Sequence, residues 1–346
     1  MSLSQFRTVF KYEKTINWFP GHMAKGVKQM RDQMRSVDLI VETRDARIPL
    51  SSINPQFEQI IGNKDRLVVY NKVDLAPPYV QETMDRELQK RGQQAIFTDA
   101  MSDNKSVKQI LAAAVERARV DPMKFSQYSI MVVGMPNVGK SSLINALRHI
   151  GINKGKAAST GAKPGVTRAV SNRIKVLQNP NVYLVDTPGV MMPYIHDPET
   201  AIKVALTGGM KDNIADEIVL ADYLLFRLNR LADTNYCGVL GLHQPTDDIN
   251  ELMAALGRRI GALRKGGELD TDKTLRYFLR TYRDGMFGRL CLDELDEASI
   301  DEFYASASSG HPQSRNQEKK AKRAAQRQRA LEKKNQKSGH GQQRAK

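Results

Sequence analysis

The sequence has few cysteines, few aromatic residues and no long apolar run. It contains two cysteines, Cys237 and Cys291, and a single tryptophan. Two cysteines so far apart match neither a disulfide framework nor paired zinc ligands, so we expect two inert, buried thiols in a reducing compartment. The longest apolar stretches, such as 129–135, are far shorter than the ~18 residues of a membrane-spanning helix. The sequence therefore predicts a soluble or peripheral protein.

The positive charge is abundant and unevenly distributed. The net charge is +15, and residues 311–346 alone carry twelve Lys and Arg against two Glu. This tail has almost no large apolar residue, so it cannot bury a core and is expected to be disordered, or helical only when bound. Such a charge implies an anionic partner, and both an RNA and an anionic membrane surface fit it.

The N-terminal segment is also basic. Arg7, Lys11 and Lys14 face one acid, Glu13, within residues 1–15. This composition is typical of a short mitochondrial presequence. A basic terminus that is not removed has the same composition, so both interpretations stay open.

Apolar periodicity predicts an α/β fold with a mostly parallel sheet. Helical spacing follows Ser141 and is expected to stop at Gly151, whereas the chain beyond about residue 205 shows helical patterns alone. One pattern, preceded by Asp248, runs from Leu252 to Leu263, and another from Leu275 to Tyr282. Strands are expected at 38–42, 66–70, 95–98, 129–134 and 182–185, with a half-exposed strand at 169–176.

The strongest motif is Gly134-Met-Pro-Asn-Val-Gly139-Lys140-Ser141, which fits G-x-x-x-x-G-K-[ST] between a predicted strand and a predicted helix. Gly139 allows backbone amides to close around phosphate oxygens, and the helix N-terminus adds partial positive charge. Lys140 is expected to contact the β and γ phosphates, and the Ser141 hydroxyl to ligate magnesium. The motif predicts a phosphate-loop NTPase.

Two further motifs follow strand ends. In Asp186-Thr-Pro-Gly189, the acid is expected to hold magnesium and the glycine amide to sense the γ phosphate. In Asn71-Lys72-Val-Asp74, the Asp74 carboxylate can accept two hydrogen bonds from guanine N1 and N2, a pair that adenine does not offer. The sequence therefore predicts GTP rather than ATP as the nucleotide.

The three motifs occur in an unusual order, because the base-reading motif precedes the phosphate loop. A permuted chain can build the same site from the same strand ends. At this point the sequence resembles the circularly permuted GTPases that assist ribosome assembly, most closely their mitochondrial subfamily, over about residues 16–305. The motifs that carry the resemblance are Trp18-Phe-Pro-Gly-His22-Met-Ala-Lys25, Asp45-Ala-Arg47-Ile-Pro49, Gly165-Val-Thr167, Asp186-Thr-Pro-Gly-Val190 and Leu279-Arg-Thr-Tyr-Arg-Asp-Gly-Met-Phe-Gly288.

The resemblance implies roles for residues that the patterns alone do not assign. Thr98-Asp99-Ala100 matches the loop that supports the guanine base, and Thr167 looks like the switch threonine that joins the magnesium shell. Asn137 matches an asparagine that helps to hold potassium beside the phosphates in related GTPases. The implied nucleotide-binding set is Asn71, Lys72, Asp74, Asp99, Ala100, Asn137, Val138, Gly139, Lys140, Ser141, Ser142 and Gly189, with Ser141, Thr167 and Asp186 at magnesium.

The hydrolytic step needs a group that the sequence does not place in the usual position. Common small GTPases have a water-orienting glutamine directly after the Asp-x-x-Gly glycine, but this chain has Val190, which cannot orient or deprotonate water. By resemblance, His22 takes this part, although a histidine satisfied within a Pro-Gly turn is the open alternative. The expected catalytic set is His22, Lys140, Thr167 and Gly189. Asp45 and Arg47 are expected to form an internal ion pair that braces a loop.

The expected organisation is a presequence at 1–15, a circularly permuted GTPase domain at 16–205, a helical RNA- or ribosome-binding domain at 206–305 and a basic tail at 306–346. The resemblance implies a monomeric GTP-hydrolysing assembly factor for the large ribosomal subunit and its rRNA. The expected location is the mitochondrial matrix, with contact to the inner membrane, and a bacterial-type cytoplasm is the alternative. A GTP-sensing RNA-binding scaffold with negligible turnover is the rival function, and Asp74 argues against an ATPase.

Overall fold

The computed structural model describes residues 6–12, 30–54, 60–62, 64–120, 127–152, 173–178, 180–186, 195, 197–210, 216–231 and 235–308. The chain divides into two compact units, Met1–Ile300 and Asp301–Lys346. The sheet, the core and the site described below all belong to the first unit.

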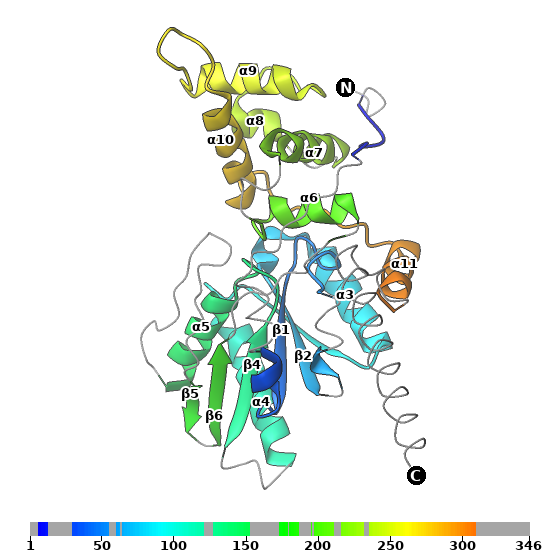
Figure 1. Ribbon diagram of the computed structural model, residues 1–346, viewed down its shortest axis with the longest axis vertical. Coiled ribbons are helices and arrows are strands. Elements are labelled where there is room, and N and C mark those ends of the chain that lie inside the picture. Colours follow the sequence, from blue (N-terminus) through cyan, green and yellow to red (C-terminus); the bar gives the residue numbers. More distant parts are fainter. Residues whose placement is uncertain are drawn as a thin grey trace, which may run out of the picture. The chain divides into compact units, whose positions relative to one another are not determined.

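This unit contains a six-stranded sheet, ordered β3-β2-β1-β4-β6-β5 (Figure 1). The first five strands in this order are parallel, and β5 at the edge runs antiparallel to β6. The prediction of a mostly parallel sheet is confirmed, and a strand lies in the described part of each expected range. Residues 169–172 of the strand expected at 169–176 lie outside the described residues. The strands are β1 (Leu39–Asp45), β2 (Asp65–Asn71), β3 (Gln94–Thr98), β4 (Tyr128–Val133), β5 (Arg173–Gln178) and β6 (Asn181–Asp186).

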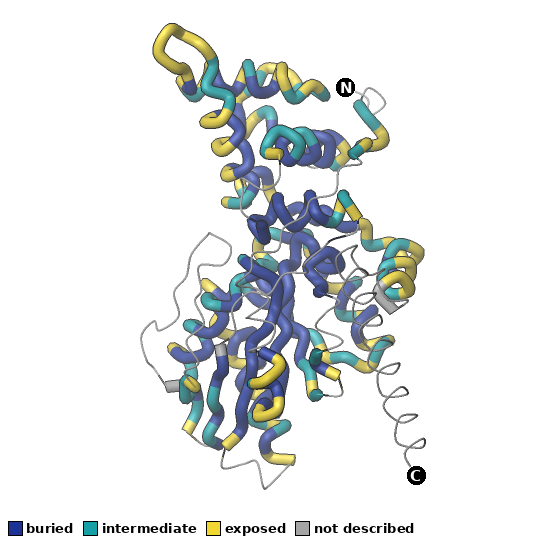
Figure 2. The backbone as a smooth tube through the Cα atoms, viewed as in Figure 1, coloured by how far each residue is buried: buried dark blue, intermediate teal, exposed yellow. Residues whose placement is uncertain are grey.

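The central strands are buried on both faces (Figure 2). Alternate residues point to opposite faces of a strand, so Leu39 and Val41 of β1 join one apolar cluster while Ile40 joins another. Helices α4 (Asn104–Val120) and α5 (Lys140–Ile152) supply the first cluster. Helix α3 (Pro78–Lys90) packs beside β3. A short 3-10 helix, η2 (Val73–Leu75), precedes α3 in the chain.

Gly151 does not end its helix, contrary to the expectation from sequence. Helix α5 continues to Ile152. A Cβ atom on Gly151 would lie 1.7 Å from the carbonyl oxygen of Val176 in β5. The glycine therefore permits close contact between a helix and a strand, which a pattern of neighbours along the chain does not reveal.

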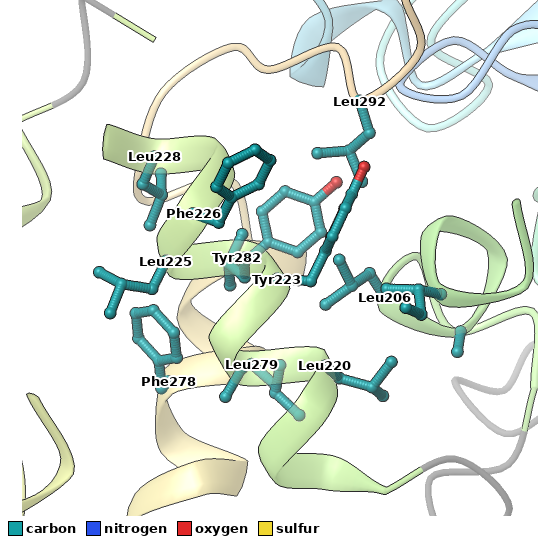
Figure 3. Close-up of a cluster of buried hydrophobic side chains, with 14 of the residues drawn as sticks. Leu206, Leu220, Tyr223, Leu225, Phe226, Leu228, Phe278, Leu279, Tyr282 and Leu292 are labelled. Atoms are coloured by element: carbon teal, nitrogen blue, oxygen red, sulfur yellow. The ribbon is translucent and has the colours of Figure 1, made fainter. Parts of the chain in front are cut away.

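The chain from 198 to 283 forms helices without a named strand in its described part, and their apolar sides meet in one core (Figure 3). The 275–282 pattern is confirmed, because Leu275, Phe278, Leu279 and Tyr282 are all buried. The other pattern extends too far: α9 ends at Arg259, and Leu263 lies beyond it with 52% of its surface exposed. The helices are α6 (Pro198–Leu206), α7 (Glu217–Arg230), α8 (Tyr236–Leu240), α9 (Ile249–Arg259) and α10 (Thr271–Arg283), followed by α11 (Glu297–Ser308).

Residues 6–12 lie against this helical core. The Arg7 guanidinium pairs with Asp222 at 2.7 Å and with Asp247 at 3.0 Å. The Phe10 ring meets the Tyr223 ring edge-on, with their centroids 5.1 Å apart. The segment thus contacts α7 and the loop before α9 through both charge and apolar surface.

Both cysteine thiols lie in the described part of the chain. Cys291 is buried, as expected, whereas Cys237 is half-buried, and both are free. None of the helices in the described ranges combines the length and the apolar character needed to cross a bilayer.

Candidate nucleotide-binding site

The predicted motifs meet at one edge of the sheet. Parallel strands all end at the same edge, which is where open α/β sheets bind their ligands. Asn71 ends β2, Asp45 ends β1, and the 134–141 loop follows β4. Because the order is β3-β2-β1-β4, only β1 separates the base-reading loop from the phosphate loop. The permuted sequence therefore places both loops beside each other.

Asn71 holds three of the predicted segments together. Its side-chain Nδ2 donates to the Val138 carbonyl of the phosphate loop at 2.9 Å. Its Oδ1 accepts a hydrogen bond from the Ala100 N–H at 3.0 Å. Asn71 is only 3% exposed, so both bonds are shielded from water and are strong relative to exposed ones. The base-reading loop, the phosphate loop and the 98–100 loop are thus fixed by one side chain.

Gly139 is needed for this arrangement. Its φ of +97° lies in the region that favours glycine. A Cβ atom there would stand 2.0 Å from the Asn71 Nδ2, which leaves no room for both. The position of the Asn71 amide, which joins the loops, therefore depends on a glycine at position 139.

The start of α5 supplies the groups expected to hold phosphate. Lys140 is the first residue of the helix, and its Nζ donates to the Met135 carbonyl at 2.9 Å, which folds the side chain back onto the loop. Ser141 and Ser142 lie in the same first turn and are half-buried. A helix N-terminus with an adjacent ammonium and a hydroxyl fits a phosphate group and its metal ion.

A buried charge cluster lies between the two loops. The Asp45 carboxylate accepts from Arg47 Nη2 at 2.8 Å and from Lys72 Nζ at 2.9 Å, which confirms the expected ion pair and adds a lysine to it. Lys72 also donates to the Asn137 carbonyl at 2.6 Å. The side chain that follows Asn71 therefore contacts the phosphate loop as well.

The pKa of Asp45 reflects its two cationic partners. Burial alone would raise this pKa, but Arg47 and Lys72 outweigh burial and hold it well below its usual range. A lowered carboxyl pKa means that the stabilisation is present above the pKa of the unfolded chain and is lost only as the pH falls through the folded value. The Asp45 carboxylate therefore stays charged at neutral and mildly acidic pH.

Asp74 and Asp99 lie at the base-reading side of the site. Partial burial and the nearby negative charge of Asp99 both raise the pKa of Asp74. The Asp99 carboxylate accepts from the Met101 N–H at 3.0 Å and from the Ser102 hydroxyl, so it caps its own turn. Asp74 lies in η2, and its role in reading a base stays a prediction, while the hydrogen bonds of Asp99 shape its own turn.

Several predicted residues lie outside the described residues. These are His22, Thr167 and Gly189, together with Val190. The backbone of Asp186 ends β6, where it pairs with Val132 beside the phosphate loop, but its side chain is not described. The expected roles of these residues stay predictions.

Sequence reasoning missed the contacts that the helical part, residues 198–292, makes with the phosphate loop, with η2 and with the residues just after β1. The Asn137 Nδ2 donates to the Thr207 carbonyl at 3.1 Å, just after α6. The Leu290 N–H donates to the Leu75 carbonyl at 3.0 Å, and the Leu292 N–H donates to the Arg47 carbonyl at 2.9 Å. One or both partners in each bond are backbone groups, which carry no residue-type signal.

Comparison with known proteins agrees with this geometry. The family model described as 50S ribosome-binding GTPase matches residues 129–255. The GNP-bound YlqF structure from T. maritima has a TM-score of 0.55 and 22% sequence identity, and the match covers 79% of this chain and 99% of that chain. At this identity the likeness establishes the fold.

Curated relatives match over most of their length. "Mitochondrial ribosome-associated GTPase 1" of Mus musculus is 41% identical over 292 residues, covering 80% of this chain and 89% of the relative. "Ribosome biogenesis GTPase A" of Priestia megaterium is 38% identical over 292 residues, covering 82% of this chain and 98% of the relative. With this identity, this coverage and the permuted order of its motifs, the chain belongs to the family of circularly permuted GTPases that includes mitochondrial ribosome-associated GTPase 1.

Proposed function

We propose that this GTPase is an assembly factor that binds the large ribosomal subunit in mitochondria and leaves it after GTP hydrolysis. The observation that carries the GTPase part is the Asn71 side chain, which joins the guanine-reading and phosphate loops. The names of the relatives support the ribosomal part, since they describe a ribosome-associated and a ribosome-biogenesis GTPase.

The site residues fit a guanine nucleotide with magnesium. Asp74 reads the base while Ala100 and Asp99 shape the loop beside it. Lys140 and the amides of residues 137–142 hold the phosphates. The magnesium ligands in this proposal are Ser141, Thr167 and Asp186, and Asn137 holds potassium beside the phosphates. Magnesium supplies electrostatic stabilisation of the charge that develops on the phosphates.

Hydrolysis in this proposal takes its water-orienting group from the N-terminal motif. Val190 has no polar atom in its side chain, so His22 is assigned this part, with the Gly189 amide sensing the γ phosphate. The rival function, a scaffold that holds GTP with negligible turnover, rests on the same Val190.

The RNA-facing surface is assigned to the helical part and the tail. Residues 249–289 contain nine Lys and Arg against five Asp and Glu. On α10, Lys273 and Arg276 are exposed beside Tyr277, a residue that is 44% exposed and is proposed to stack on an unpaired base. This surface and the basic tail bind rRNA, while contact of the tail with the anionic inner membrane in the matrix is the alternative.

The deciding experiment is multiple-turnover phosphate release from GTP by the monomeric protein, with and without purified large subunits. Stimulated release is expected with the mitochondrial subunit and supports the assembly-factor proposal. Absence of stimulation supports the scaffold. Replacing potassium with sodium in the same assay tests the Asn137 proposal, because equal rates in both buffers would remove it.

Guanine reading by Asp74 has a separate test. The Asp74→Asn variant is expected to lose GTP binding and to gain binding of xanthosine triphosphate, whose base carries a carbonyl oxygen in place of the amino group that guanine donates from. Lack of such rescue, with the fold intact, would count against the assigned base contact.

A further inference from the structure

Helix α10 reaches the nucleotide loops through a series of buried contacts. The Tyr282 ring lies under the Arg47 guanidinium, with 5.7 Å between the guanidinium carbon and the ring centroid. Arg47 pairs with Asp45, Asp45 accepts from Lys72, and Lys72 donates to the Asn137 carbonyl. A side chain of α10 is thus three contacts away from the lysine of the base-reading motif.

The aromatic ring is the relevant part of Tyr282. Arg47 gives its Nε and Nη2 to Asp45, and its buried Nη1 has no hydrogen-bond partner among the described residues. The buried Tyr282 hydroxyl also has none within that part of the chain. The guanidinium is therefore held by one carboxylate and one ring face, a cation–π contact that gains strength when water is excluded.

A second contact series runs in parallel with the first. Arg283, the last residue of α10, donates to the Leu206 carbonyl at 2.9 Å and to the Ala205 carbonyl at 3.1 Å. The next residue, Thr207, accepts from the Asn137 side chain. The end of α10 therefore binds residues 205 and 206, and the next residue, Thr207, binds the phosphate loop. Asn137 needs such support, because its φ is +60° in a residue with a side chain.

We propose that Tyr282 is a positioning residue for nucleotide binding, which acts through Arg47 and Asp45 to keep Lys72 against the phosphate loop. The Tyr282 ring packs on Arg47 and not on the phosphate loop, so its effect depends on the orientation of α10. The inference requires guanine-nucleotide binding and is independent of the ribosomal partner. Because α10 exposes Arg276 and Tyr277 elsewhere on its surface, a partner bound there is coupled to nucleotide affinity by the same helix.

The test compares two replacements in the full chain. Tyr282→Leu removes the ring face but keeps an apolar side chain, whereas Tyr282→Phe keeps the face and removes only the unpartnered hydroxyl. Release of a fluorescent GDP analogue is followed after addition of excess GDP. We expect release about tenfold faster for the leucine variant and within about twofold of wild type for the phenylalanine variant. Wild-type release from the leucine variant, or equally fast release from both, would overturn the proposal.

A double-variant cycle separates positioning from general destabilisation. Once Lys72→Met has removed the end of the series, adding Tyr282→Leu is expected to change GDP release by less than about twofold, because the pair acts through one path. If the two replacements instead multiply their separate effects on the rate of GDP release, Tyr282 does not act through Lys72. If the leucine variant does not fold, Arg47→Lys gives the same test, since a lysine loses the planar stack and the paired contact. A wild-type chain that binds no GDP would instead refute the nucleotide site itself.

Discussion

The buried side-chain amide of Asn71 fixes the positions of two loops. It satisfies the Val138 carbonyl and the Ala100 N–H, and it occupies the space that a side chain at position 139 would need. The motif Asn-Lys-x-Asp identifies Asn71 from sequence, but the motif does not reveal its bond to the phosphate loop. That bond depends on β1 lying between β2 and β4, which is a property of the fold.

The Asn71→Ala variant is expected to lose about 2 kcal/mol of unfolding free energy, because two buried backbone groups lose their partner. GDP affinity should fall with it, since the two loops are no longer joined. Urea denaturation and GDP titration measure the two effects. The control is Asn250→Ala, which removes an exposed amide from α9. Unchanged GDP affinity in Asn71→Ala would show that the bridge does not organise the site.

Asp74 should make guanine binding sensitive to mild acid. Partial burial and Asp99 raise the pKa of this carboxyl, so it takes up a proton at a higher pH than an ordinary aspartate. The protonated form cannot accept both guanine hydrogen bonds, and affinity is therefore lost as the pH falls toward that pKa. The stability of the unliganded fold depends on pH in the opposite direction. Because the folded chain raises the pKa of Asp74, the stability that this group contributes is present at low pH and is lost as the pH rises through the raised pKa.

The Asp99→Asn variant is expected to move this loss of GDP affinity to lower pH, because it removes one of the two causes of the raised Asp74 pKa. Titration of GDP binding between neutral and acidic pH measures the shift. Glu82→Gln, which removes an exposed charge of the same sign from α3, is the control and should leave the profile in place. Identical profiles for Asp99→Asn and wild type would contradict the electrostatic coupling of the two carboxylates.

At the scale of elements, the strand cores were predictable and their ends were not. A short apolar run marks a strand at 38–42, yet β1 runs from Leu39 to Asp45. Arg44 and Asp45 are charged but buried, because Arg44 pairs with Glu42 and Asp45 pairs with Arg47. Hydrophobic periodicity does not detect a charged residue that is buried in an ion pair. The end of α5 was misjudged for a related reason, since the contact at Gly151 comes from β5.

The N-terminal segment gives a second element-scale result. Composition allows a removable presequence at 1–15, and Arg7 and Phe10 within it contact the helical core. Removal of the segment would leave Asp222 and Asp247 without their shared cation and expose part of the Tyr223 ring. The presequence stays a prediction. Because of these contacts, removal of the segment is expected to lower the free energy of unfolding.

Arg7→Ala is expected to lower the unfolding free energy by about 1 kcal/mol, the upper end for a partly exposed ion pair, because one guanidinium serves two carboxylates. Thermal denaturation at low and high salt measures the loss, which should shrink as salt screens the charges. Lys11→Ala, in the same segment and exposed, should change the melting temperature little. Equal effects of the two variants would contradict the role of the Arg7 contacts.

At the scale of the whole molecule, the permuted order of the motifs determines where the helical part joins the sheet. The chain enters the sheet at the central strand β1 and leaves it at β6, so the helical part follows the strand that ends at Asp186. Its last segment then contacts η2 through the bond of Leu290 to Leu75, and Arg47, just after β1, through the bond of Leu292. The helical part is therefore attached to the nucleotide site at both ends, which favours coupling between nucleotide state and partner binding.

The basic tail should contribute binding strength without affecting nucleotide affinity. Residues 311–346 carry a net charge of +10, so each phosphate they neutralise releases counterions and makes affinity fall as salt rises. Deletion of 313–346 is expected to weaken co-sedimentation with the large subunit and to flatten its salt dependence, while GDP affinity stays within about twofold. A tail of equal length with Gln in place of every Lys and Arg should behave like the deletion, because charge rather than length carries the effect. Unchanged co-sedimentation of both variants would reject the tail as an rRNA contact, and loss of binding to anionic vesicles alone would assign it to the membrane instead.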